Sequence, residues 1–188
     1  MTVPRANVPT GARPLPDASV LRGIRMLLMD VDGVLTDGRI VFDHDGNESK
    51  SFHVHDGAGI VYWHRAGLLS GFLSGRGGRV VEDRARELGV HEIHLCRLDK
   101  ERAFDELLER RRLAPSEIAY IGDDLLDVPV LRRVGFAASV CNGRSEVFRH
   151  VHYVTRTRGG DGAVREVVEL LLQSQDRWDD VVAKCGMP

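Results

Sequence analysis

Two pairs of acids in this sequence stand where a buried apolar run ends. One run, residues 24–29, leads directly into Asp30, and Asp32 follows two positions later. Another apolar run ends in Asp123 and Asp124. Carboxylates gathered at one place repel each other unless a cation joins them, and Mg²⁺ favours a partial shell of such hard oxygen ligands. We therefore expect Asp30, Asp123 and the backbone carbonyl of Asp32 to bind Mg²⁺.

The same residue types, with three more polar groups, fit the transfer of a phosphoryl group. Asp30 could attack phosphorus and form an aspartyl-phosphate. Asp32 could protonate the leaving alkoxide and later deprotonate the hydrolytic water. Charge on the phosphoryl oxygens needs donors and a cation, which the Ser74 hydroxyl, the Gly75 backbone N–H and Lys100 would supply. The predicted catalytic residues are therefore Asp30, Asp32, Ser74 and Lys100.

The elements that would bring these residues together can be read from the hydrophobic pattern. Short apolar runs predict strands at 24–31, 68–75, 90–96, 117–124, 136–142 and 152–155. Amphipathic runs predict helices at 57–67, 78–89, 99–113, 127–135, 145–151 and 162–178. This alternation predicts an α/β fold, a Rossmann-like parallel sheet with helices on both faces. Ligands bind beyond the carboxyl ends of such strands, where the acids stand.

Composition and length limit the classes of protein that the chain can belong to. The 188 residues suffice for one domain, and 43% apolar and 29% charged residues are ordinary for a globular protein. The net charge of −2 gives no reason to expect nucleic acid or an anionic membrane as a partner. We expect a flexible N-terminal leader at 1–20, one phosphatase domain at 21–176 and a C-terminal tail at 177–188.

Cysteine usage and the N-terminus bear on the compartment. Cys96, Cys141 and Cys185 are scattered without metal-binding spacing, which fits a reducing environment. The first 19 residues lack the apolar stretch of a secretory signal, and no apolar run approaches the ~20 residues of a membrane span. We predict a cytoplasmic protein.

Four segments, taken in order, resemble a known superfamily. "DVDGVLTDG", "LSGR", "LDK" and "YIGDDLLDVPV" resemble the four motifs of the haloacid dehalogenase superfamily of phosphatases. "GNESKSFHVHDGAGI", "VVEDRARELGV" and "YVTRTRGGDGAVREVVELLL" further resemble its branch of 3-deoxy-D-manno-octulosonate 8-phosphate phosphatases. The resemblance covers roughly residues 24–175. It implies a Mg²⁺-dependent phosphate monoester hydrolase acting on a sugar-acid phosphate.

The branch resemblance carries further implications about architecture and substrate contacts. It implies a small β-hairpin insertion at 39–54 in place of a large cap domain, and a homotetramer in which that hairpin helps to cover a neighbour's site. It places Arg76 and Arg84 near the substrate, with the C-terminal tail reaching an adjoining pocket. His55 stands where the branch usually has arginine, so it is expected among the substrate contacts with Gly75.

Several other functions compete with this one. A calcium loop of the EF-hand type is disfavoured because Val34 and Val41 stand where it needs oxygen ligands. The related nonulosonate 9-phosphate phosphatases often carry glutamate where this chain has Arg76, although "GAGIVYWHRAG" resembles them. A phospho-acceptor signalling module and a catalytically silent scaffold also remain open. His53 and His55 are expected to share one face of a strand, because they are two positions apart, and interface or exposed positions suit them better than a metal pair.

Overall fold

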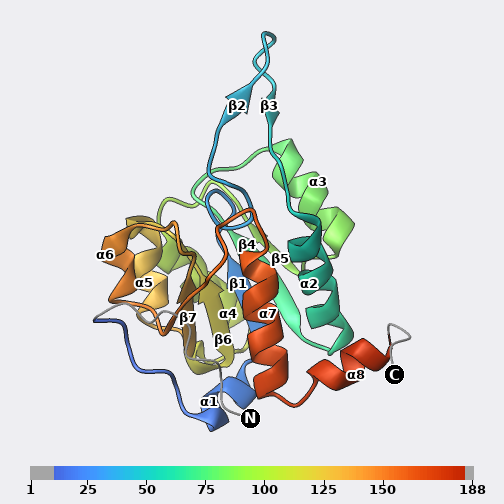
Figure 1. The fold of residues 1–188 in the computed structure, drawn as a ribbon. Coiled ribbons are helices and arrows are strands. Elements are labelled where there is room, and N and C mark those ends of the chain that lie inside the picture. Colours follow the sequence, from blue (N-terminus) through green and yellow to red (C-terminus); the bar gives the residue numbers. More distant parts are fainter. Residues whose placement is uncertain (1–10, 185–188) are drawn as a thin grey trace.

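The core of the protein is one parallel sheet. The computed structural model describes residues 11–184, and its main sheet has six strands in the order β5-β4-β1-β6-β7-β8 (Figure 1). These strands are β1 Met26–Met29, β4 Leu69–Leu73, β5 Glu92–His94, β6 Ile118–Ile121, β7 Phe136–Ser139 and β8 Tyr153–Val154. Every neighbouring pair in the sheet is parallel. The predicted α/β fold with a parallel sheet is confirmed.

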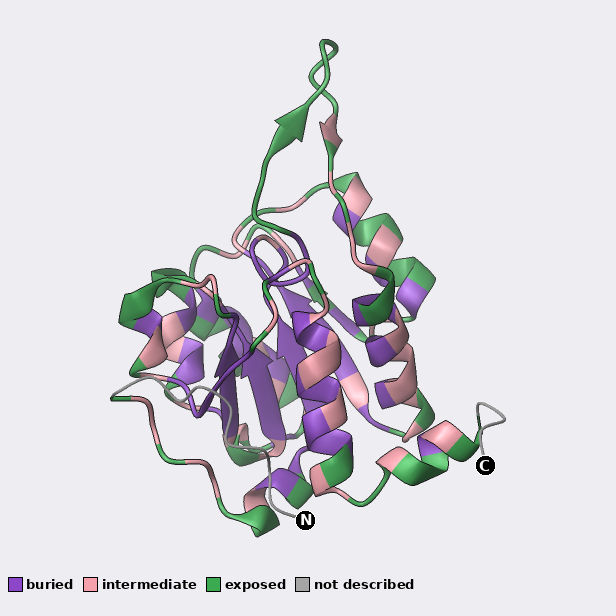
Figure 2. Ribbon diagram, in the orientation of Figure 1, coloured by how far each residue is buried: buried purple, intermediate pink, exposed green. Residues whose placement is uncertain are grey.

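Helices cover both faces of this sheet. They are α1 Ala18–Gly23, α2 Val54–Arg65, α3 Arg79–Leu88, α4 Lys100–Arg111, α5 Val128–Leu131, α6 Ser145–Phe148, α7 Ala163–Ser174 and α8 Trp178–Ala183, with 3₁₀ turns η1 Pro115–Glu117 and η2 Leu125–Asp127. Apolar side chains of α1, α2, α3, α7 and α8 belong to the core on one face. Those of α4, α5 and α6 belong to the core on the other face. The sheet is therefore buried from both sides, as Figure 2 shows.

The central strand β1 explains why its segment is apolar at every position. Leu27 and Met29 point into one core, while Met26 and Leu28 point into the other. All four side chains are fully buried. A strand covered on both faces has no polar side, which produces a continuous apolar run instead of an alternating one. Polar residues can therefore appear only where β1 ends, at Asp30.

A small antiparallel hairpin is the only insertion between β1 and α2. Its strands are β2 Val41–Phe42 and β3 Glu48–Ser49. The turn is held by Asp43, whose carboxylate accepts the backbone N–H groups of Asp45 and Asn47. The hairpin extends away from the sheet at its carboxyl edge and is largely exposed (Figures 1 and 2). The predicted hairpin insertion without a large cap domain is confirmed.

The start of α2 differs from the sequence prediction. The helix begins at Val54 instead of residue 57, so the return limb of the hairpin is shorter than expected. His53 is the N-cap, and its Nδ1 accepts the backbone N–H of His55. Asp56 in the first turn accepts the N–H groups of Gly162 and Arg165, which ties the helix start to α7. The expectation that His53 and His55 share a strand face is wrong, because both stand at a helix start.

The end of the chain also differs from the prediction of one closing helix over 162–178. Helix α7 ends at Ser174, where the Gln175 amide donates to backbone carbonyls of residues 21 and 24. Asp176 then adopts a left-handed conformation with φ of 56° and turns the chain. Helix α8 follows, with Trp178 against Tyr62 and with Val181 buried. Part of the predicted tail is thus packed on the domain.

The N-terminal segment is also attached to the domain within its described part. The boundary expected at residue 20 falls inside α1, which the sequence analysis did not predict. Arg13 donates its backbone N–H to the Val151 carbonyl and its guanidinium to the Leu131 carbonyl. Residues 1–10 of the expected leader lie outside the described residues, and the division into leader, domain and tail stays a prediction. Among residues 11–184, none of the helices is long and apolar enough to span a bilayer.

Two glycine-rich loops make a close backbone contact beside β1. A Cβ atom on Gly159 would lie 1.6 Å from the carbonyl oxygen of Gly33. The Gly160 N–H donates to the Val34 carbonyl, and the Gly159 N–H donates to the Asn142 side chain. The segment before α7 therefore supports the loop that follows Asp30, and only glycine allows this approach.

We predict that Gly159→Ala destabilises the protein by more than ~2 kcal/mol, because the new methyl group collides with backbone that cannot move freely. The displaced loop should also lower turnover. Urea unfolding measures the first effect and steady-state kinetics the second. Gly23→Ala is the matched control, because a Cβ at Gly23 meets no atom within 4 Å. Equal stability of the two variants would contradict the packing argument.

Candidate active site

The carboxyl edge of the sheet forms a cavity that gathers most of the predicted residues. Asp30 directly follows β1, Ser74 directly follows β4, and Asp123 follows β6 after one glycine. Because these three strands are neighbours, the residues meet at one edge. The cavity of about 200 Å³ is lined by Asp30, Asp32, Ser74, Gly75, Arg76, Leu98, Lys100, Asp123, Asp124, Leu126 and Asp127.

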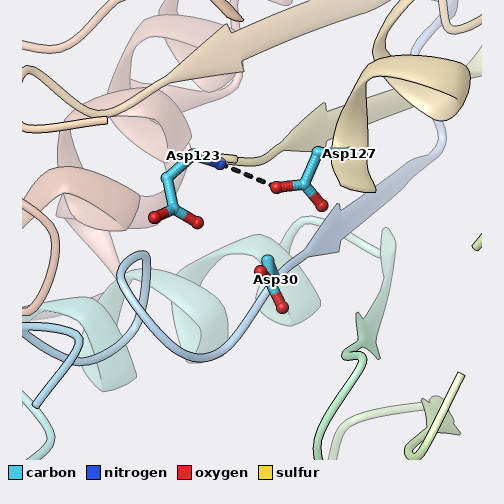
Figure 3. Close-up of side chains that lie close together, drawn as sticks. All are labelled: Asp30, Asp123 and Asp127. Atoms are coloured by element: carbon cyan, nitrogen blue, oxygen red, sulfur yellow. Dashed lines mark hydrogen bonds between the residues drawn. The ribbon is translucent and has the colours of Figure 1, made fainter. Parts of the chain in front are cut away.

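Three carboxylates of this cavity form a compact cluster. Asp30, Asp123 and Asp127 each place an oxygen so that all three atoms lie within 4.8 Å of one another (Figure 3). Burial, together with the charge of Asp127, raises the pKa of Asp30 to about 7. Burial, with the charges of Asp30 and Asp127, raises the pKa of Asp123 to about 8. The cluster therefore attracts positive charge.

One buried lysine supplies part of that charge. Lys100 is the first residue of α4, whose N-cap Asp99 accepts the backbone N–H of Arg102. Its ammonium group lies 3.1 Å from Asp30 Oδ2 and 2.6 Å from Asp127 Oδ1. Burial alone would lower the pKa of Lys100, but the two carboxylates outweigh it and raise that pKa. Lys100 is therefore a fixed cation beside the predicted nucleophile, not a solvated helix residue.

Asp127 organises the cluster through contacts that leave it little capacity for another partner. Its Oδ1 accepts from the Tyr120 hydroxyl at 2.5 Å and from Lys100. Its Oδ2 accepts the backbone N–H groups of Asp123 and Asp124 at 2.9 and 3.0 Å. Four donors occupy the two oxygens of a fully buried carboxylate. Asp127 therefore shapes the loop that carries Asp123 and holds Lys100, while Asp30 and Asp123 remain available.

Neither Asp127 nor Tyr120 is among the catalytic or metal-binding residues predicted from the sequence. The tyrosine lies within strand β6 and is fully buried, so its pattern is that of a core residue. A buried tyrosine hydroxyl needs a hydrogen-bond partner. Asp127, seven residues later in the chain, was the signal in the sequence that could have identified this partner.

Asp123 has the features of a metal ligand. Its Oδ1 is buried and accepts no hydrogen bond from residues 11–184. A Cβ on Gly33 would lie 2.2 Å from Asp123 Oδ2, so the glycine of "DVDG" lets the loop after β1 approach this carboxylate. Hard oxygens from Asp30 and Asp123 in a cavity suit Mg²⁺. The residues present therefore fit the predicted Mg²⁺. Asp127 supports them by binding the backbone N–H of Asp123 and the ammonium group of Lys100.

Asp32 has different partners from Asp30. Lys50, from the return limb of the hairpin, donates to Asp32 Oδ1. The Arg76 Nε lies 3.7 Å from Asp32 Oδ2, an oxygen that accepts no hydrogen bond from the described part of the chain. The nucleophile candidate and the acid–base candidate are thus held by separate cations.

The turn after β4 presents the predicted phosphate donors. Ser74 is buried, and its backbone N–H and carbonyl bond to the carbonyl of His94 and the N–H of Arg97. The Ser74 hydroxyl oxygen accepts the Arg76 N–H at 3.2 Å. Gly75 lines the same cavity. This turn places Ser74 and Gly75 in the same cavity as the acids.

Two predicted substrate contacts lie outside this cavity. Arg84, on α3, pairs with Glu87 at 2.8 Å and stacks over the ring of Phe52 in a separate hollow. His55 is exposed at the start of α2. Within one chain, neither residue joins Asp30. Their contact with substrate stays a prediction.

A parallel sheet with an acidic cluster and a fixed lysine at its carboxyl edge suits a protein that transfers phosphoryl groups. A profile of haloacid dehalogenase-like hydrolases matches residues 74–167. The 3-deoxy-D-manno-octulosonate 8-phosphate phosphatase KdsC of Escherichia coli K12 is 42% identical over 157 residues, or 84% of each chain. The Yersinia pestis KdsC is 40% identical over 176 residues, covering 93% of this chain and 94% of that one.

A solved structure agrees with these relatives. The 3-deoxy-D-manno-octulosonate 8-phosphate phosphatase of Moraxella catarrhalis, crystallised with magnesium, phosphate and KDO, superimposes with a TM-score of 0.87 at 38% identity. The match covers 89% of this chain and 97% of that one. The chain therefore belongs to the haloacid dehalogenase-like hydrolases, in the branch of the 3-deoxy-D-manno-octulosonate 8-phosphate phosphatases.

We predict that the metal-free protein loses stability as pH rises from 6.5 to 8. The unfolded chain releases these protons near pH 4, whereas folded Asp30 and Asp123 release them only around pH 7 and pH 8, so the folded state holds more protons in this window, by an amount that falls toward pH 8. Each such proton changes the free energy of unfolding by about 1.4 kcal/mol per pH unit. Burial lowers the pKa values of His64 and His152 to about 4. These histidines therefore change the pH dependence of stability mainly below about pH 6.5, where the unfolded chain protonates them.

Thermal unfolding in EDTA at several pH values measures this slope. Saturating Mg²⁺ should remove it, because the ion favours the ionised carboxylates. Asp123→Asn should reduce the slope in EDTA and weaken the response to Mg²⁺. A metal-free stability that is constant or rises from pH 6.5 to 8 would contradict the assignment.

Proposed function

We propose that this protein is a Mg²⁺-dependent phosphatase that hydrolyses 3-deoxy-D-manno-octulosonate 8-phosphate to the free sugar acid and inorganic phosphate. The position of Asp30 carries the proposal: it lies at the end of the central strand, beside the fixed cation Lys100 and the carboxylate of Asp123. Relatives named for this activity are 40–42% identical over most of the chain. Mg²⁺ bound by Asp30 and Asp123 would neutralise phosphate charge and orient the phosphoryl group.

The first half of the reaction transfers the phosphoryl group to the protein. A carboxylate oxygen of Asp30 attacks phosphorus, and the bond between phosphorus and the sugar oxygen breaks. Asp32 gives its proton to the departing alkoxide. The Val31 N–H at 2.7 Å from Asp30 Oδ1 and Lys100 at Oδ2 fix the attacking carboxylate. The Ser74 hydroxyl and the Gly75 N–H donate to the phosphoryl oxygens.

The second half releases phosphate. Asp32, now ionised, takes a proton from water, whose oxygen attacks the phosphorus of the aspartyl-phosphate. The bond to Asp30 breaks, inorganic phosphate leaves, and both carboxyl groups return to their initial states. A receiver-type phospho-acceptor has no use for such an acid, whereas Asp32 has an oxygen available in the cavity.

Arg76 supports the choice of an octulosonate over a nonulosonate substrate. Its side chain is half exposed at the cavity, and the related nonulosonate 9-phosphate phosphatases often carry glutamate at this position, so the resemblance links arginine here to the octulosonate ester. The relatives described above are named for the octulosonate ester. The nonulosonate alternative is not favoured. Location in the cytoplasm remains a prediction from the sequence.

We also propose that the protein is a homotetramer in which the hairpin covers a neighbour's cavity. The hairpin exposes Ile40, Val41 and Phe42 at 40%, 50% and 59% of their surface. Leu98 and Leu126, which line the cavity, are 71% and 50% exposed. Apolar surfaces of this kind at a protruding strand and at a cavity mouth are suited to mutual burial.

We predict that Asp30→Asn abolishes phosphate release from octulosonate 8-phosphate in Mg²⁺, because the amide cannot serve as the nucleophile. Asp32→Asn should lower the rate by roughly 10²–10⁴-fold, as expected for a lost general acid and base. Released phosphate is the readout. Asp105→Asn, on the exposed face of α4 and outside the cavity lining, is the control and should retain full activity. Turnover by Asp30→Asn would overturn the mechanism, and activity on the nonulosonate ester alone would overturn the substrate.

We predict that Phe42→Asp dissociates the tetramer, since burying the new charge would cost several kcal/mol. Light scattering measures the mass, and KM for the sugar phosphate should rise with dissociation. Gln173→Asp, which adds the same charge on the exposed face of α7, should leave the assembly intact. A wild-type chain that is monomeric at assay concentration would refute the assembly without touching the chemistry.

A further inference from the structure

One buried cation, Lys50, extends from the hairpin to the active site. Lys50 directly follows β3, and its side chain is only 1% exposed although the hairpin strands are largely exposed. A buried ammonium group is strongly unfavourable without anionic partners. Lys50 therefore depends on the carboxylates around it.

Those carboxylates belong to an alternating chain of charges. Lys50 donates to Asp32 Oδ1 and lies 3.1 Å from Glu48 Oε1. The same Glu48 oxygen accepts from Arg76 at 3.0 Å. Two acidic and two basic side chains thus form a continuous network from the hairpin to the cavity. In this network Lys50 lies between Glu48 and Asp32.

This arrangement makes the two oxygens of Asp32 different. Oδ1 is fixed by Lys50, whereas Oδ2 is buried and accepts no hydrogen bond from residues 11–184. An acid–base group must present one oxygen to the proton it moves and must be held in a defined orientation. The contact with Lys50 supplies the orientation and leaves Oδ2 available for the proton.

We propose that Lys50 is a positioning residue for the acid–base step, which holds Asp32 through Oδ1 so that Oδ2 serves the leaving group and the water. This inference rests on the proposed function, because it assumes that Asp32 moves protons. Lys100 has the corresponding task for Asp30, but from helix α4. Through Lys50, proton transfer by Asp32 depends on the position of the hairpin relative to the cavity.

A purely structural lysine and a substrate-contacting lysine would behave differently. A lysine that only fastens the hairpin would, when replaced, slow all substrates alike. A lysine that binds the sugar acid directly would change KM more than kcat. A positioning lysine affects the substrate whose leaving group needs a proton, and spares one whose leaving group departs as a stable anion.

The test compares Lys50→Met with wild type in single-turnover experiments with excess enzyme and Mg²⁺. The substrates are octulosonate 8-phosphate, which leaves as an alkoxide, and p-nitrophenyl phosphate, which leaves as a stable phenolate. We expect cleavage of the sugar phosphate to slow by about 10–100-fold, part of the full effect of a general acid. Release of p-nitrophenolate should change by less than about threefold under the same reasoning.

Matched variants complete the design. Lys50→Arg should recover most of the sugar-phosphate rate, because it keeps a cationic donor. Arg22→Met removes an exposed cation of α1 that does not line the cavity, and it should behave as wild type. If Lys50→Met does not fold, Lys50→Gln provides the same comparison with a neutral donor. A crystal structure of the folded variant should show the Asp32 carboxylate turned from its wild-type position.

Asp32→Asn separates failure of this inference from failure of the proposed function. If Asp32→Asn shows the leaving-group selectivity and the Lys50 variant does not, Lys50 has no positioning role. If Asp32→Asn shows no selectivity, the acid–base role of Asp32 itself is wrong. An unmoved Asp32 in the Lys50 variant, or a raised KM with unchanged kcat, would also overturn the inference.

Discussion

Mutual repulsion of buried carboxylates is the constraint on which this structure depends. Asp30, Asp123 and Asp127 meet at the end of the sheet, where Asp30 and Asp127 are buried and Asp123 is partly buried. The protein offsets part of the repulsion with Lys100 and directs four donors to Asp127. Asp30 and Asp123 keep raised pKa values because this compensation is incomplete. The remaining demand for positive charge is what makes the site suitable for Mg²⁺ and a phosphate ester.

Two acids only two positions apart acquire separate tasks through their surroundings. Asp30 follows the central strand and is fixed from within the domain by Lys100. Asp32 lies in the loop that follows Asp30 and is held by Lys50 from the hairpin. The proposed nucleophile thus belongs to the core of the domain, while the proposed acid–base group is connected to a protruding element. In the proposed mechanism, this division would let proton transfer by Asp32 respond to the hairpin without disturbing Asp30.

The strands, and the polar residues that directly follow them, were accessible from the sequence because both signals are local. A strand covered on both faces must be apolar throughout, so Asp30 and Asp123 stand out at the strand ends. Parallel neighbours then bring them to one edge. The helix boundaries were less accessible: α2 starts early because His53 caps it and Asp56 bonds to α7, and both contacts require the folded chain.

The sequence by itself determined the sheet, the acidic pair and the phosphoryl-transfer chemistry, since these follow from local hydrophobic patterns, residue types and motif order. Only the tertiary structure decided which charges pair: Lys50 with Asp32, Lys100 with Asp30, and Tyr120 with Asp127. A buried ion or hydroxyl selects its partner by distance and orientation in three dimensions, and residues far apart in the chain carry no local mark of that choice.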